Sequence, residues 1–204
     1  MRNILLFELN EVPFQVIDYY CKKYPNSVLA TTLAKSSEYE TYSYDEGHLH
    51  PWSTWPTVHR GVTNAQHSIK DLGEDTSEVD QKFPPIWKIV KDNNISTGVF
   101  MSLHTYPLPN NVEEYKFYVP DPFAEGPECH PSSLNSFQNF SLTMSRKSVR
   151  NVDTGIPIKE AAALGIKLPF MGLKTNTIKD VVSQLVDERK SPWKATRRRT
   201  YQSV

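Results

Sequence analysis

A hydroxyl pair just ahead of a short polar helix is the first feature of this chain that could do chemistry. Ser53 and Thr54 precede Trp55-Pro56, and we expect a helix over about residues 57–63. A hydroxyl at a helix start faces unpaired backbone N–H groups and the positive end of the helix dipole, where phosphate oxygens bind well. Thr54 is therefore a candidate nucleophile, but the same place suits an ordinary helix cap, and Ser53 is the rival for either role.

The end of the first apolar segment carries a second set of polar side chains. Glu8, Asn10 and Glu11 follow the apolar run from Ile4 to Phe7. Carboxylate and amide oxygens bind hard divalent cations, so all three residues are candidate metal ligands. Structural roles fit them as well: Glu8 could be a buried carboxylate that needs a partner, and Asn10 and Glu11 could cap the helix that follows.

These two sets of side chains need a sheet to bring them together. Strands are predicted at 3–9, 37–47, 95–102 and 115–121, and helices at 10–24, 57–63, 84–94, 156–165, 176–190 and 193–204. The alternation predicts an α/β fold with a mostly parallel sheet over residues 1–123, an irregular lid or insertion at 124–175, and a helical segment at 176–204. Ligands of such sheets bind beyond the carboxyl ends of the strands, where residues 8–11 lie.

Composition limits the classes of function. The 204 residues contain 23 Lys+Arg and 23 Asp+Glu, so the formal net charge is zero and no general nucleic-acid or membrane surface is predicted. Cys21 and Cys129 form neither a disulfide framework nor a metal motif, and we expect two free thiols. No apolar run is long enough for a signal segment or a membrane span, so we expect a cytoplasmic protein.

A series of short motifs runs through roughly the first half of the chain. They read, in order, Leu-Leu-Phe-Glu-Leu-Asn-Glu at 5–11, Thr54-Trp55-Pro56, Val62-Thr63-Asn64, His67-Ser68-Ile69, Pro85-Ile86-Trp87 and Gly98-Val99-Phe100. This ordered set resembles the alkaline phosphatase superfamily, and most of all its nucleotide pyrophosphatase/phosphodiesterase branch. The resemblance implies a three-layer α/β domain that hydrolyses phosphate monoesters or diesters with two divalent metal ions, commonly zinc, with manganese or magnesium as alternatives.

The resemblance also assigns roles to individual residues. In this family the Thr of the Thr-x-Pro position contacts metal, attacks phosphorus and forms a phospho-enzyme, and that residue here is Thr54. The metal-bridging Asp at the end of the first strand corresponds to Asn10, whose neutral amide binds cations more weakly than a carboxylate does. Glu8 or Glu11 would then supply the missing charge.

The implied substrate is a small-molecule phosphate ester. Trp55, Phe100 and Tyr106 are candidates to contact it, although core packing is the ordinary role of Trp and Phe. The family's remaining Asp and His ligands do not occur in their usual spacing, and the sequence stops inside a helical pattern. We therefore expect an N-terminal portion of a longer enzyme, inactive by itself. The alternative is a catalytically inactive relative that serves as a binding or scaffolding module, and the sequence does not indicate the oligomeric state.

Overall fold

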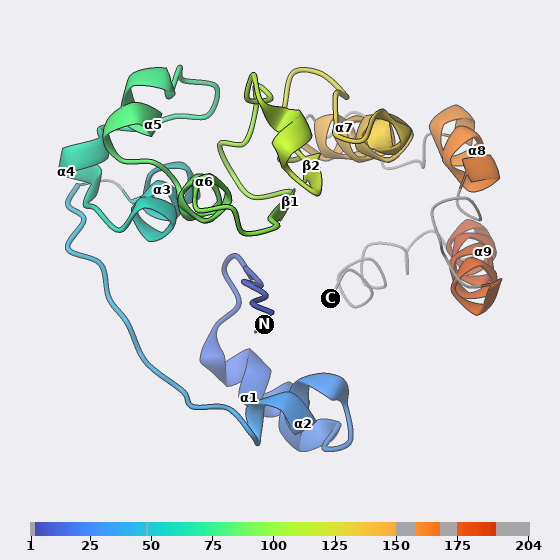
Figure 1. Cartoon of the computed structure of the whole chain (residues 1–204). Helices are drawn as coiled ribbons and strands as arrows, with labels where there is room; N and C mark the ends of the chain where they lie inside the picture. Colours follow the sequence, from blue (N-terminus) through green and yellow to red (C-terminus); the bar gives the residue numbers. More distant parts are fainter. Residues whose placement is uncertain (1–2, 48, 150–157, 168–174, 191–204) are drawn as a thin grey trace. The chain divides into compact units, whose positions relative to one another are not determined.

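The computed structural model describes residues 3–47, 49–149, 158–167 and 175–190, which form two compact units, Met1–Ser132 and Ser133–Val204 (Figure 1). The first unit contains α1 (Phe14–Lys23), α2 (Val28–Leu33), α3 (Pro51–Arg60), α4 (Asn64–His67), α5 (Ser77–Lys82), α6 (Ile86–Asp92), β1 (Gly98–Phe100), the 3-10 helix η1 (Val112–Glu114) and β2 (Phe117–Val119). A second 3-10 helix, η2 (Ser132–Leu134), lies at the boundary, and α7 (Asn135–Val149), α8 (Ile158–Lys167) and α9 (Thr175–Lys190) belong to the second unit.

The described residues combine helices with a small parallel sheet, which agrees with the predicted α/β class at a coarse level. Strands β1 and β2 pair in parallel, with Gly98 opposite Phe117 and Phe100 opposite Val119. Both lie within predicted strands, because each has a short β-prone run bounded by turn residues. Next to this pair, Val99, Tyr115 and Tyr118 form a buried core cluster, against which Trp87, Leu108 and Val112 pack.

Helices with a clear apolar face are also confirmed. The predicted helices at 10–24, 84–94, 156–165 and 176–190 correspond to α1, α6, α8 and α9. Local signals are sufficient for such elements, because hydrogen bonds form within the segment itself.

The two strands predicted near the N-terminus are wrong. Neither residues 3–9 nor residues 37–47 form a strand, and Ile4 and Leu5 are 93% and 86% exposed. A strand needs the backbone groups of a neighbouring strand, and β1 pairs only with β2 in the part of the chain that the structure describes. An apolar run predicts a strand but does not supply this neighbour.

Two stretches that we expected to lack regular structure contain helices. Residues 70–81, a polar stretch with no predicted helix or strand, include most of α5, and the predicted irregular region at 124–175 includes the whole of α7. In α7, Gln138 and Leu142 lie four residues apart and are both buried, so a helical face exists despite the Ser- and Asn-rich composition. Residues 150–157 and 168–174 of the predicted lid, His48 and the helix expected at 193–204 lie outside the described residues.

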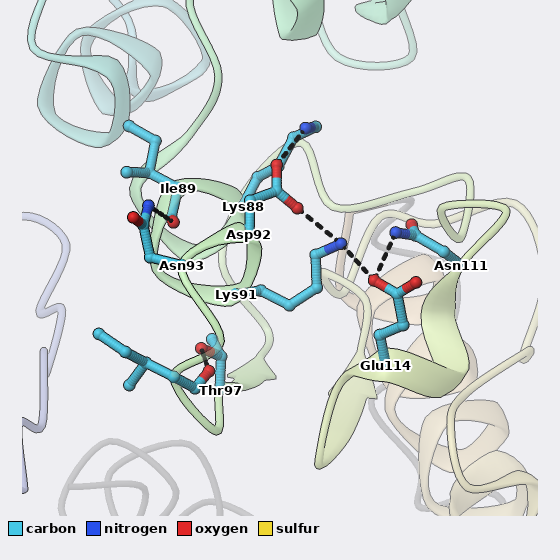
Figure 2. Close-up of polar contacts among 9 residues, drawn as sticks. Lys88, Ile89, Lys91, Asp92, Asn93, Thr97, Asn111 and Glu114 are labelled. Atoms are coloured by element: carbon cyan, nitrogen blue, oxygen red, sulfur yellow. Dashed lines mark hydrogen bonds and ion pairs between the residues drawn. The ribbon is translucent and has the colours of Figure 1, made fainter.

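A charged cluster ties α6 to η1 (Figure 2). The Lys91 ammonium lies 2.7 Å from an Asp92 carboxylate oxygen and 2.6 Å from one of Glu114, and Asn111 also donates to Glu114 at 2.8 Å. These two carboxylates raise the pKa of Lys91, chiefly through hydrogen bonds. The cluster therefore connects α6 to η1, the element that precedes β2 in the chain.

No helix in the described ranges is both long and apolar enough to cross a lipid bilayer.

Candidate functional site

The predicted nucleophile lies inside helix α3 and not at its entrance. The helix begins at Pro51, so Thr54 is already in its first full turn, and its N–H and Oγ1 both donate to the His50 carbonyl, at 2.9 and 3.1 Å. The expectation of a helix over 57–63 is therefore wrong: Pro51, and not Pro56, is the proline at the helix start. The helix ends at Gly61, whose φ of 66° is the left-handed conformation typical of a C-terminal cap.

Ser53, and not Thr54, caps the start of α3. Its Oγ accepts a hydrogen bond from the His50 N–H at 3.3 Å and donates to the His50 carbonyl at 3.1 Å, and the residue is buried. Both hydrogen-bonding functions of the hydroxyl are thus used to close the first turn of α3. Thr54 is only half-buried and keeps the more accessible hydroxyl.

Asn10 meets α3 one residue away from Thr54. The indole N–H of Trp55 donates to Asn10 Oδ1 at 3.0 Å. This contact brings together the two sets of side chains that the sequence singled out, although they lie 45 residues apart. It also gives Trp55 a definite partner within the protein.

Glu8 is engaged through both oxygens of its carboxylate. His59 Nε2 lies 2.8 Å from Oε1, and the Ser102 hydroxyl donates to Oε2 at 3.0 Å. The side chains of His59 and Glu8 are 2% and 18% exposed. Burial opposes ionisation of the carboxyl, but the hydrogen bonds from His59 and Ser102 and the charge interaction with His59 outweigh it and hold the pKa of Glu8 below its usual 4.5. The buried carboxylate that needs a partner therefore has two.

Aromatic rings enclose this pair. The His59 imidazole stacks on Trp55, with centroids 5.6 Å apart, and meets the edge of Trp87 at 4.8 Å. Trp55 therefore contacts Asn10 directly, and it stacks on His59, which in turn binds Glu8. These contacts are compatible with a packing role for Trp55, and its contact with a substrate stays a prediction.

The loop after β1 contacts α3 at a backbone carbonyl that a proline leaves without its helical hydrogen bond. Pro56 has no N–H, so the carbonyl of Trp52, four residues earlier, receives no helical hydrogen bond from it. His104 Nε2 lies 2.7 Å from that carbonyl oxygen and supplies the missing donor. Burial lowers the pKa of His104 below 6.5 and so favours the neutral imidazole, although the hydrogen bond to the Trp52 carbonyl acts in the opposite direction. The same loop carries Ser102, the second donor to Glu8.

A separate buried network joins α3 to α4 and to the segment before α3. The Ile69 N–H donates to His67 Nδ1 at 3.0 Å, so the proton of the neutral ring is on Nε2, which lies 3.1 Å from Thr57 Oγ1. Thr57 in turn donates to Asp45 at 2.6 Å, and the Asn64 N–H donates to the other oxygen of Asp45 at 2.7 Å. The order carboxylate, hydroxyl, imidazole is a structural chain, since the hydroxyl proton already points at Asp45.

The remaining predicted site residues do not join these contacts. Glu11 is exposed, with a φ of 55°. Phe100, the last residue of β1, is 56% exposed, and Tyr106 follows in the loop, where burial and nearby Glu128 raise the pKa of its hydroxyl. A surface depression of about 460 Å³ is lined by residues that include His50 and Ser53 but not Thr54.

The predicted metal ligands do not fit a metal ion in this arrangement. The oxygens of Glu8 and the Oδ1 of Asn10 accept hydrogen bonds from protein donors. Within the described ranges there is no group of three or more His, Cys, Asp or Glu side chains that could hold a metal. Metal binding therefore stays an implication of the motif resemblance.

Sequence reasoning missed the partners of Glu8. The hydrogen bond between His59 and Glu8 joins residues 51 positions apart and has no local signature in the sequence. One signal was available for His104, because a proline inside a helix always leaves a carbonyl that some other donor must satisfy. Comparison of the chain with protein-family models, with curated proteins and with solved structures finds no match.

Proposed function

We propose that the protein is a metal-dependent phosphoric ester hydrolase of the phosphodiesterase or phosphatase type, acting on a small-molecule phosphate ester in the cytoplasm. The ordered motifs between residues 5 and 100 support the proposal. The observation that carries it is the hydrogen bond between Trp55 and Asn10, because the two motif pieces that would supply the nucleophile and a metal ligand touch each other.

The proposed fold is the three-layer architecture of the alkaline phosphatase superfamily. The activity is proposed for a polypeptide that also contains the family's remaining Asp and His ligands, and residues 1–204 alone are expected to be inactive.

The proposed reaction proceeds through a phosphothreonine. Thr54 Oγ1 attacks phosphorus in line, the bond from phosphorus to the leaving-group oxygen breaks, and the threonine proton passes to a base. Water then attacks the phosphothreonine, which releases the phosphate product and restores the hydroxyl. The hydroxyl proton now points at the His50 carbonyl, which is not a base, so Thr54 must give up this hydrogen bond before it reacts. Two divalent ions, zinc by preference, are proposed from the resemblance alone, and no step is assigned to them.

A binding or scaffolding module is the second candidate, and one observation favours it. The oxygens of Glu8 and Asn10 that would face a metal are engaged by Ser102, His59 and Trp55. If this arrangement is permanent, the protein would be a catalytically inactive relative that serves as a binding or scaffolding module.

Hydrolysis of chromogenic phosphate monoesters and diesters by the complete gene product, with added Zn²⁺, Mn²⁺ or Mg²⁺, tests the proposal. Thr54→Ala should abolish turnover and leave folding intact. Thr31→Ala is the matched control, because Thr31 is an exposed helical threonine that also donates to the carbonyl four residues earlier, that of Ser27, at 2.9 Å. Equal turnover by the Thr54→Ala variant and the parent would refute the nucleophile, and ester binding without turnover by the parent would favour the second candidate.

A further inference from the structure

The Glu8 carboxylate connects three segments of the first unit. It belongs to the N-terminal segment, and it accepts hydrogen bonds from His59 on α3 and from Ser102 in the loop after β1. A carboxylate only accepts hydrogen bonds, so His59 Nε2 must carry a proton and the Ser102 hydroxyl must point at Glu8. Both carboxylate oxygens of Glu8 therefore accept hydrogen bonds from protein donors. The His59 side chain is only 2% exposed, so this contact is shielded from water.

The side-chain contacts of Glu8 and Asn10 hold the N-terminal segment, residues 3–10, against α3. Residues 3–9 belong to no helix or strand, and the apolar side chains that precede Glu8 are exposed, so packing does not fix the segment. Glu8 and Asn10 are two residues apart, just before and within a turn, and both side chains contact α3. Glu8 binds α3 through His59, and Asn10 binds it through Trp55, one helical turn earlier.

We propose that Glu8 is a positioning residue: its contacts with His59 and Ser102 hold Asn10 against Trp55, beside Thr54, and Glu8 does not itself bind a metal. The placement of Asn10 is independent of any activity. Its catalytic consequence rests on the proposed function, because a displaced Asn10 would matter only to an enzyme that uses it.

The Trp55 indole N–H reports directly on this placement. Its cross-peak in a ¹H–¹⁵N spectrum, assigned with Trp55→Phe, should move in Asn10→Ala, which deletes the acceptor. Glu8→Ala and the milder Ser102→Ala should move the same peak in the same direction, while Glu74→Gln, a carboxylate change in a distant loop, should leave it in place. The proposal is overturned if Ser102→Ala and a folded Glu8→Ala both keep the peak where the parent has it, or if Asn10→Ala does not move it.

The conservative variant Glu8→Gln separates positioning from metal binding. The glutamine carbonyl can accept from His59, and its amide can donate to Ser102 Oγ, since a hydroxyl accepts as well as donates. Positioning therefore predicts that Glu8→Gln keeps the Trp55 peak and most of the turnover, while Glu8→Ala loses about 10²-fold in kcat. Loss of turnover in Glu8→Gln equal to that in Glu8→Ala would instead make Glu8 a metal ligand. Absence of turnover in the complete gene product would refute the proposed function and leave the spectroscopic result to decide the placement of Asn10.

Discussion

Replacing Thr57 by valine tests the buried network that joins α3 to α4. Valine keeps the branched shape of threonine and removes only the hydroxyl. The change deletes the hydrogen bond to Asp45 at 2.6 Å and the acceptor that lies 3.1 Å from His67 Nε2. His67 is 1% exposed, so water cannot replace the lost acceptor, and the ring is left with its backbone hydrogen bond to Ser53.

The expected loss in the free energy of unfolding follows from these two contacts. A buried donor that loses one of two acceptors costs about 1 kcal/mol, less than a donor left without any partner. The Asp45 carboxylate keeps the Asn64 N–H and is partly exposed, so its lost bond adds about 0.5–1 kcal/mol. The sum is about 1.5–2 kcal/mol, which moves the midpoint of a urea unfolding curve by about 1 M at a typical slope.

Urea unfolding followed by circular dichroism provides the measurement, with Thr54→Val as the matched control. Thr54 lies three residues earlier on the same helix, and its hydroxyl donates only to a helical carbonyl, so its loss should change the free energy of unfolding by about 0.5 kcal/mol or less. Equal midpoints for Thr57→Val and Thr54→Val would refute the assignment of the network.

Two further perturbations probe the same unit. Burial lowers the pKa of His67 below its usual 6.5 in the folded protein. The stability that the neutral ring contributes is therefore complete above pH 6.5 and is lost as the pH falls through the lower pKa of the folded state. The midpoint of urea unfolding should decrease from about pH 7 to about pH 5, and His67→Gln should make this decrease smaller. A side-chain carbon at Gly98 would overlap the Phe117 ring, so Gly98→Ala should destabilise the strand pair by about 1–3 kcal/mol. Thermal unfolding measures this loss, and it should shrink when Phe117→Ala is combined with Gly98→Ala; an unchanged loss would place the strain elsewhere.

The parts of the fold that the sequence predicts correctly are those with local causes. Helix α6 follows a proline start and an Asn-Asn stop, and β1 and β2 are short β-prone runs between turns. Residues 3–9 have an equally clear pattern, but whether they pair depends on a neighbouring strand that no local pattern specifies. The start of α3 was misplaced because two prolines, Pro51 and Pro56, both suit a first turn.

The candidate site divides in the same way. The sequence predicts Glu8, Asn10 and Thr54 as site residues, and the structure brings Asn10 into contact with Trp55, the neighbour of Thr54. It did not identify His59 or Ser102 as partners of Glu8, because those contacts join segments 51 and 94 residues apart. Only the folded chain decides which donor reaches a buried carboxylate.

Mass spectrometry of the protein quenched during turnover of a phosphate ester tests the central claim most directly. The account predicts a phosphate adduct on the peptide that contains Ser53 and Thr54, assigned by fragmentation to Thr54 and absent from the Thr54→Ala variant. An adduct on Ser53, or steady hydrolysis with no adduct on either hydroxyl, would contradict it.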